Sequence, residues 1–403
     1  MQLEGARAPF FTARSWVVLI LYVLLNGLNQ FEWLRYAPVA TETGRVYGVD
    51  LAAVGTLAQI FPLIAFLLSL PLGWVVDRFG LRASLWTAAL LSAAGGSLRC
   101  LGGYEWALAG QILFALAQPL LVNSVGRLAI TWFHGPWRLR ATGIATMSLY
   151  VGLAVAFLVV PMLGGILLAS LQGDAVFCVV LAAATLLLVP RDPAAVDIGP
   201  VEHPSLGGAL SLLRNRRFLL ILAAGLVGNG FFAAVSNWLE KILEPQGFDS
   251  GDAGLAGLLL LVGGIIGSAV LPGLVAKPER LRPVVVGSVA LSLPATALLL
   301  TTSSTPLMLA AALTLGFALL SPLPVLIDIV QRVGGHALSG IALSLFWLVG
   351  NFAAFAGSRA MAVVAESGNW HIGGMALLGT LMVQVCLAFV SLAPVGLPAP
   401  RKG

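Results

Sequence analysis

Charged residues are scarce in this sequence. Only 10% of its 403 residues are Asp, Glu, Lys or Arg, whereas 59% are hydrophobic and the mean hydropathy is +0.97. This composition excludes a soluble globular protein. A membrane-spanning helix needs about 20 predominantly apolar residues, and the period-two alternation of a barrel strand is absent. The sequence therefore predicts an all-α polytopic membrane protein.

Cysteine and histidine are also rare, and neither has the spacing of a disulfide framework or of a metal site. These residues are Cys100, Cys178 and Cys386, in or beside apolar runs, and His134, His203, His336 and His371, scattered over loops and helix ends. The phosphate-binding pattern G-x-x-x-x-G-K-[ST] does not occur, and no hydrolase triad or redox motif stands out. We expect no metal, no cofactor, no direct use of ATP and no enzymatic activity.

Charged or turn-rich breaks divide the chain into twelve apolar runs. We expect spans at about Ser15–Ala40, Leu51–Val76, Ala83–Leu101, Trp106–Phe133, Ala141–Leu168, Ala175–Val189, Phe218–Leu243, Gly254–Val275, Pro283–Thr302, Pro306–Val330, Leu338–Val364 and Ile372–Ala393. The first is longer than a bilayer requires and should be tilted or bent. The longest polar stretch, 191–217, reads as a linker between a first six-helix half (1–190) and a second (218–403).

The net charge of +5 comes from short loops rather than from a basic patch, which argues against nucleic acid as a partner. With both termini inside the cell, all but five of the 22 Lys and Arg lie at inner loops or inner helix ends, as the positive-inside rule expects. The five are Arg35, Arg45, Arg99, Lys241 and Arg359. Short loops, and the lack of a cleavage site and of N-x-[ST] sites, favour a prokaryotic cell membrane with both termini cytoplasmic.

The run GWVVDRFGLR, from Gly73 to Arg82, is a charged island between two apolar runs. Gly73 and Gly80 permit close helix approach and a tight turn, Asp77 supplies a fixed negative charge, and Arg78 and Arg82 suit an anionic leaflet. The arginines alone fit any positive-inside loop. The whole run resembles the G-x-x-x-D-R-x-G-x-R loop of major facilitator superfamily transporters.

That resemblance implies two six-helix bundles with a substrate cavity between them. It also implies that Asp77 meets the start of the eleventh span near Ala337 and an arginine of the next inner loop, Arg138 or Arg140. The corresponding loop of the second half, 273–282, has Lys277 where the acid should be. The two inner gates are therefore not equivalent.

Two further charges inside spans are candidates for a gate. Arg127 lies about two turns inside the inner end of the fourth span, where it fits an inner gate or an anionic substrate. Asp328 has Arg332 four residues on, which is the spacing of a helical ion pair. The glycines of the fifth span, including Gly143 and Gly152, indicate close helix packing.

Polar residues crowd the second half of the first span: Asn26, Asn29, Gln30, Glu32, Trp33 and Arg35. Polar groups inside a membrane are costly unless they are paired or wetted. Asn26, Asn29 and Trp33 share one helical face, which either faces a cavity or makes hydrogen bonds between helices. Glu32 has three open roles: exchange of a proton for substrate, a negative charge opposite Trp33, or a structural ion pair with Arg35.

Longer stretches of the first half resemble the feline leukaemia virus subgroup C receptor (FLVCR) family, which is linked to choline and haem transport. They are NQFEWLRYAPVA, VYGVD, PLGWVVDRFGLR and, in the fourth span, AQPLLVNSVGRLAITWF. The resemblance implies that Trp33 forms a cation–π wall for a quaternary ammonium and that Gln118 lines the same site. In the second half, Ala233, beside Phe232, stands where that family has Tyr, and Trp347 where it has Gln.

We therefore expect a transporter of a small organic solute that works by alternating access in the lipid bilayer, with a choline-like cation as the implied substrate. A proton-coupled exporter of drugs or metabolites is the alternative within the same fold, and protons are then the coupling ion. A non-transporting receptor is the alternative from another class, although these loops are short for one. We expect a monomer. The expected substrate contacts are Trp33, Asn29, Glu32, Gln118, Phe232 and Trp347.

Overall fold

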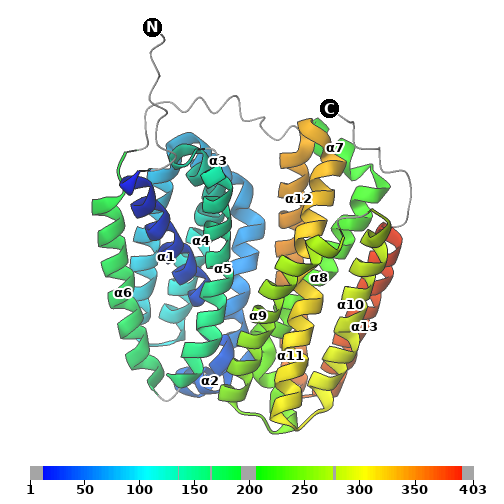
Figure 1. The fold of residues 1–403 in the computed structure, drawn as a ribbon. Coiled ribbons are helices and arrows are strands. Elements are labelled where there is room, and N and C mark those ends of the chain that lie inside the picture. The colour runs from blue at the N-terminus through cyan, green and yellow to red at the C-terminus, as the bar shows by residue number, and fades with distance from the viewer. Residues whose placement is uncertain (1–11, 135, 164–165, 192–205, 276–277, 393–403) are drawn as a thin grey trace. The chain divides into compact units, whose positions relative to one another are not determined.

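The computed structural model describes residues 12–134, 136–163, 166–191, 206–275 and 278–392, and within them the chain is helical (Figure 1). The helices are α1 (Ala13–Trp33), η1 (Ala37–Val39), α2 (Ala40–Tyr47), α3 (Leu51–Arg99), α4 (Tyr104–Trp132), α5 (Pro136–Met162), α6 (Leu167–Leu188), α7 (Leu206–Leu213), α8 (Arg216–Leu243), η3 (Glu244–Gln246), α9 (Ser250–Leu274), α10 (Pro278–Thr301), α11 (Thr305–Leu320), α12 (Leu323–Ser367) and α13 (Trp370–Ser391).

Eleven helical segments of this described part are long and apolar enough to cross a membrane. The remaining predicted span, the third in chain order, is the part of α3 that follows Gly80. The boundaries differ from expectation in two places. The short helix α7 forms inside the predicted linker, of which residues 192–205 lie outside the described part. The eleventh span does not start afresh at Leu338, because α12 runs on without interruption from Leu323.

Helix α3 changes direction at Gly80, the second glycine of the charged island. Gly80 has φ 87° and ψ 174°, a conformation that only glycine adopts without strain. The hydroxyl of Ser84 donates to the Gly80 carbonyl at 2.8 Å, so this buried turn is held from the following helical turn. The predicted tight turn between the second and third spans is confirmed.

The first span bends, as its length predicts. Thr12 and Ser15 form a capping box at the start of α1, and the helix ends at Trp33. The backbone leaves helical geometry at Leu34 (φ −97°, ψ 13°), and the chain continues into η1 and α2. Trp33 is therefore the last residue of α1, and only irregular turns link it to η1.

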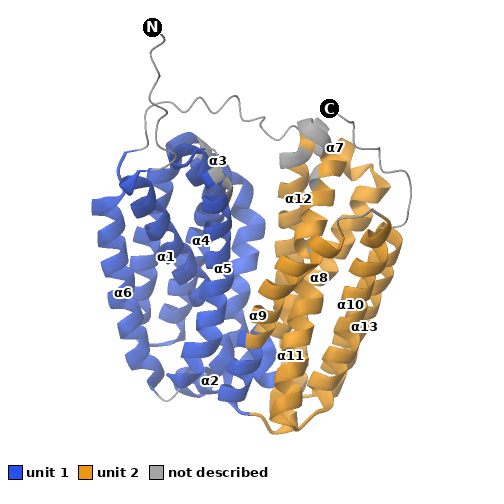
Figure 2. Cartoon of the chain, viewed as in Figure 1, with its two compact units in different colours: residues 1–201, 237–241, 249–258 blue, residues 202–236, 242–248, 259–403 orange. Residues whose placement is uncertain are grey.

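The chain divides into two compact units, coloured separately in Figure 2. Unit 1 comprises residues 1–201, 237–241 and 249–258, and unit 2 comprises residues 202–236, 242–248 and 259–403. Short pieces of α8 and α9 thus belong to unit 1, while the remainder of both helices belongs to unit 2.

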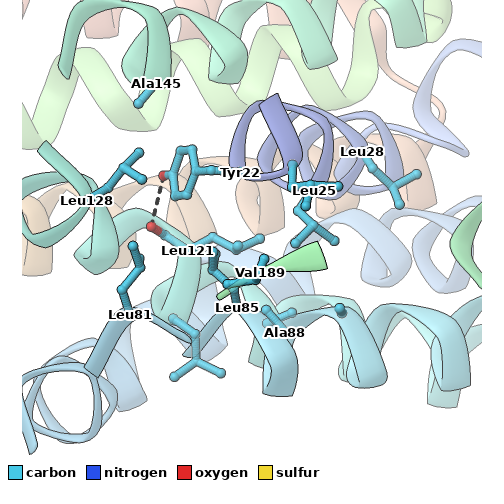
Figure 3. Close-up of a cluster of buried hydrophobic side chains, with 14 of the residues drawn as sticks. Tyr22, Leu25, Leu28, Leu81, Leu85, Ala88, Leu121, Leu128, Ala145 and Val189 are labelled. Atoms are coloured by element: carbon cyan, nitrogen blue, oxygen red, sulfur yellow. Dashed lines mark hydrogen bonds between the residues drawn. The ribbon is translucent and has the colours of Figure 1, made fainter. Parts of the chain in front are cut away.

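The core of unit 1 is built from α1, α3, α4, α5 and α6 (Figure 3). The Tyr22 hydroxyl is fully buried there and donates to the Leu121 carbonyl at 2.9 Å, which joins α1 to α4. Helices α1 and α5 touch through glycine: a side chain at Gly152 would clash with the carbonyl oxygen of Gly27. By contrast, Gly143 has open space beside it.

In unit 2, glycines also allow neighbouring helices to approach closely. A side chain at Gly357 of α12 would clash with the Gly230 carbonyl of α8, and one at Gly316 of α11 would clash with the Leu260 carbonyl of α9. Small residues that allow backbones to approach closely are typical of membrane helix packing, because lipid supplies no hydrophobic force between helices.

Candidate functional site

Trp33 lies half-buried at the end of α1 and is held by α3 on two sides. Its indole N–H donates to the Ala58 carbonyl at 3.0 Å. Its ring stacks on Phe61, with centroids 6.2 Å apart and planes 17° from parallel. Both contacts restrict the ring, so the indole is a fixed aromatic surface rather than a freely rotating side chain.

The predicted polar face of α1 is buried and hydrogen-bonded within unit 1. The Asn26 amide donates to the Ser148 hydroxyl of α5, and the Asn29 amide donates to the Phe114 carbonyl of α4, both at 2.8 Å. Gln30 is buried as well. Of the two roles expected for this polar face, lining a cavity or bonding to other helices, these contacts are the second.

Glu32 forms an ion pair with Arg99 at the far end of α3. The Arg99 Nη1 donates to Glu32 Oε2 at 2.6 Å, and both side chains have no exposed surface. Of the roles left open for Glu32, the structural ion pair with Arg35 is replaced by this pair with Arg99. The Arg35 N–H still donates to the Glu32 carbonyl at 3.4 Å, but the backbone leaves helical geometry at Leu34, so the i, i+3 spacing no longer places the two side chains on one helical face.

Arg35 instead reaches α6. Its Nε donates to Asp174 Oδ2 at 2.7 Å, and its Nη2 donates to the Ser170 hydroxyl. Asp174 is 15% exposed and Arg35 is fully buried. The residues on both sides of the short segment Trp33–Leu34 are thus tied to two different helices.

Two glutamines of α4 are buried, and one of them, Gln111, contacts this region. The Gln111 amide donates to the Glu32 carbonyl at 3.0 Å and to the Leu57 carbonyl at 3.3 Å. Gln118, the predicted site residue, is 8% exposed, and its amide oxygen has no hydrogen-bond partner among the described residues. An unpartnered buried oxygen is an acceptor available to a ligand.

Sequence reasoning did not identify Arg99, Gln111 or Asp174 as parts of this region. Arg99 and Asp174 were visible as charges inside or beside apolar runs, which is the signal that selects functional candidates. Their partners were not, because they come from other helices.

Glu240 of α8 contacts the start of α2, and all of these residues belong to unit 1. Its carboxylate accepts from the backbone N–H of Ala40 and from the Thr41 hydroxyl, the latter at 2.5 Å. The residue that precedes α2, Val39, offers no side-chain acceptor of its own. Glu240 therefore caps a helix that its own local sequence leaves uncapped.

The predicted site residues of the second half lie in unit 2. Phe232 is half-buried on α8. Trp347 of α12 is 38% exposed and packs edge-on against Phe346, with ring centroids 5.7 Å apart. Ala233 is buried, so that position contributes no aromatic surface.

The charged island packs against α4. A Cβ atom added at Gly73 would lie 3.3 Å from the side-chain amide nitrogen of Asn123. That amide donates to the Ser69 carbonyl at 2.9 Å. Arg127 donates to the Val76 carbonyl at 3.2 Å. The side chain of Asp77 and that of Ala337 lie outside the described residues, so their predicted contact stays a prediction.

The two arginines of the island each lie on an aromatic ring. The guanidinium carbon of Arg78 is 5.4 Å from the Trp74 ring centroid, and that of Arg82 is 4.0 Å from the Trp86 centroid. In unit 2, the predicted i, i+4 pair is confirmed, with Arg332 Nη2 and Asp328 Oδ2 2.9 Å apart. Both residues are more than half exposed.

Comparison with known families decides the identity of the fold. The family model described as Major Facilitator Superfamily matches residues 15–358, which is most of the chain. This chain belongs to the major facilitator superfamily. Two solved structures share its fold: a bacterial homologue of the human lysosomal transporter Spinster (TM-score 0.75, 13% identity, 94% of this chain and 97% of that one) and the nucleoside transporter NupG (TM-score 0.74, 15% identity, 93% and 100%).

Curated relatives are consistent with the FLVCR resemblance. Solute carrier family 49 member A3 of Danio rerio is 34% identical over 293 residues, covering 67% of this chain and 61% of the relative. A solute carrier family 49 member 4 homolog of Xenopus tropicalis is 34% identical over 306 residues (66% and 65%). Choline/ethanolamine transporter flvcr2b of Danio rerio is 27% identical over 281 residues (64% and 58%). The chain spans less than two thirds of these relatives, and as animal proteins they add no support for a prokaryotic membrane.

Proposed function

We propose that this superfamily member transports a small organic cation with a quaternary or primary ammonium group, such as choline or ethanolamine, across the membrane by alternating access. The observation that carries the proposal is Trp33. Its ring is half-buried and fixed by the Ala58 carbonyl and Phe61, and a fixed indole face binds an ammonium group through the charge distribution of the ring. Relatives named as choline/ethanolamine transporters support the same substrate class.

The charges of unit 1 support recognition by an aromatic ring rather than by a carboxylate. Glu32 and Asp174 each form an ion pair with an arginine, so neither offers a free negative charge to a substrate. A quaternary ammonium cannot donate a conventional hydrogen bond, and a desolvated cation–π contact is worth about 2 kcal/mol. The buried oxygen of Gln118 adds a neutral acceptor that suits the hydroxyl of choline.

We further propose that both termini are cytoplasmic, that the linker 191–217 is also cytoplasmic, and that the protein acts as a monomer. The distribution of lysine and arginine supports this orientation. Transport by this fold does not need ATP. The two helical bundles rock against each other, and the concentration gradient of the solute or of a coupling ion drives the movement.

Uptake of radiolabelled choline and ethanolamine into proteoliposomes tests the substrate proposal. We expect saturable uptake by the unaltered protein and loss of at least tenfold in uptake efficiency in Trp33→Ala, with Trp33→Phe intermediate because phenylalanine is a weaker cation–π partner. The matched control is Trp106→Ala, since Trp106 is 45% exposed on α4 of the same unit. Absence of uptake of either solute by the unaltered protein would contradict the substrate class.

A further inference from the structure

Trp33 lies between two residues that are each tied to a different helix. Glu32 precedes it and pairs with Arg99 of α3, and Arg35 follows two residues later and pairs with Asp174 of α6. The Gln111 amide of α4 holds the carbonyl of Glu32 as well. Three helices therefore fix the backbone on both sides of one indole.

This anchoring occurs where the helix itself gives little support. The last carbonyls of an α-helix have no partner within the helix, and α1 ends at Trp33. Beyond Trp33 only single turns follow, with the Arg35 N–H donating to the Glu32 carbonyl at 3.4 Å and the Ala37 N–H to the Leu34 carbonyl at 3.2 Å. Side chains from α3, α4 and α6 add to these turns the constraint that a continuing regular helix would have supplied.

The pair of Glu32 and Arg99 is the more deeply buried of the two ion pairs. Both side chains are fully buried, the N–O distance is 2.6 Å, and the Arg99 guanidinium also lies 4.7 Å from the Phe114 ring centroid. Replacement of a buried ion pair by apolar residues is often neutral or stabilising, so a buried pair is weak evidence for a contribution to stability. A role other than stability fits this arrangement better.

We propose that Arg99 is a positioning residue for substrate recognition: through its ion pair with Glu32, it sets the orientation of the Trp33 indole that contacts the transported cation. The inference rests on the proposed function for the substrate contact. Gln111 acts in the same way through the backbone of Glu32. Neither Arg99 nor Gln111 touches the substrate.

The test removes the pair without leaving a lone buried charge. In the double variant Glu32→Gln with Arg99→Gln, we expect the KM for choline uptake in proteoliposomes to rise at least tenfold while the maximal rate stays within about twofold of that of the unaltered protein. A misoriented indole would bind the cation more weakly and so raise the KM. A loss of folded protein would instead lower the maximal rate. An unchanged KM in this variant would overturn the proposal.

A control and a milder variant keep the test decisive. Glu42→Gln with Arg45→Gln removes an ion pair of the same chemistry from α2, where the N–O distance is 2.8 Å, without touching α1, and should leave the KM unchanged. If the double variant at Glu32 and Arg99 does not fold, Gln111→Leu removes an anchor without altering any charge. That variant should raise the KM by about threefold or more, and an unaltered KM there would count against the proposal.

A measurement without substrate separates this proposal from the proposed function. In protein labelled with 5-fluorotryptophan, the ¹⁹F resonance of Trp33 is assigned by its absence in Trp33→Phe. We expect this resonance to shift or broaden in the Glu32→Gln, Arg99→Gln variant, while that of Trp106 stays in place. If the unaltered protein takes up no choline or ethanolamine, the proposed function fails, but a displaced Trp33 resonance still supports the positioning role. An unmoved Trp33 resonance overturns it.

Discussion

At the scale of single residues, two glycines of α5 differ in the space available for a side chain. Gly152 is buried against the backbone of α1, where a methyl group would clash with the Gly27 carbonyl, whereas Gly143 has open space. We expect Gly152→Ala to cost about 1–3 kcal/mol because neither backbone can yield without moving a helix. Gly143→Ala should be neutral or slightly stabilising, because alanine is the better helix former by roughly 0.5–1 kcal/mol. Thermal unfolding of the purified protein in detergent measures both, and equal melting temperatures for the two variants would contradict this account.

Ion pairs show which contacts a sequence can predict at this scale. The pair of Asp328 and Arg332 follows from the helical repeat alone, because residues four apart share one face. The pair of Glu32 and Arg99 joins two helices that are distant in sequence. Its geometry depends on how those helices pack, which no local spacing encodes. The presence of buried charges was therefore predictable, but their partners were not.

At the scale of elements, α2 depends on a residue far away in the chain. The N–H groups at the start of a helix need an acceptor, and Glu240 supplies it to the N–H of Ala40 and, at 3.4 Å, to that of Thr41. We expect Glu240→Ala to raise amide hydrogen exchange across the first turn of α2 by about tenfold or more, since hydrogen bonds to a charged group are worth about 1.5–3 kcal/mol. Mass spectrometry of peptides that cover residues 37–47 measures this.

The control for α2 is Glu105→Ala, which removes an exposed carboxylate from α4 of the same unit. Exchange in α2 should not change in that variant. If exchange across the first turn of α2 stays slow in Glu240→Ala, then the contact with Glu240 does not hold the helix.

Element boundaries were predictable where the chain carries a local signal. The excess length of the first span predicted a bend, and Gly80 predicted the turn in α3. Helix α7 was missed because the prolines, glycines and arginines around it are typical of a linker, and the continuous α12 was missed because Gly334 and Gly335 resemble a break. Helical hydrogen bonding across such residues is decided by the packing of neighbouring elements.

At the scale of the whole molecule, most of the exceptions to the positive-inside pattern have acidic partners. Four of the five basic residues assigned to the outer half form ion pairs: Arg35 with Asp174, Arg45 with Glu42, Arg99 with Glu32 and Arg359 with Glu366. The fifth, Lys241, follows Glu240 directly. The orientation rests on the bias of the lysines and arginines themselves, and the remaining 17 of the 22 favour it.

This orientation has a direct test at the two ends of α8. The helix has 28 residues, so it is about 42 Å long, enough to cross a bilayer core of about 30 Å. Arg214, before the helix, and Pro245, after it, are both exposed. Each is replaced by cysteine in turn, in a variant whose Cys100, Cys178 and Cys386 are changed to alanine. A membrane-impermeant maleimide is then added to intact cells and to inverted vesicles.

We expect position 245 to react in intact cells and position 214 to react only in inverted vesicles, because the linker before α8 is predicted to be cytoplasmic. A label that reaches both positions from the same side would mean that α8 does not cross the membrane. The reverse pattern would place both termini outside the cell and would contradict the orientation inferred from the charge distribution. Uptake by each labelled variant, compared with the unlabelled protein, shows whether the reporter positions are measured in a functional transporter.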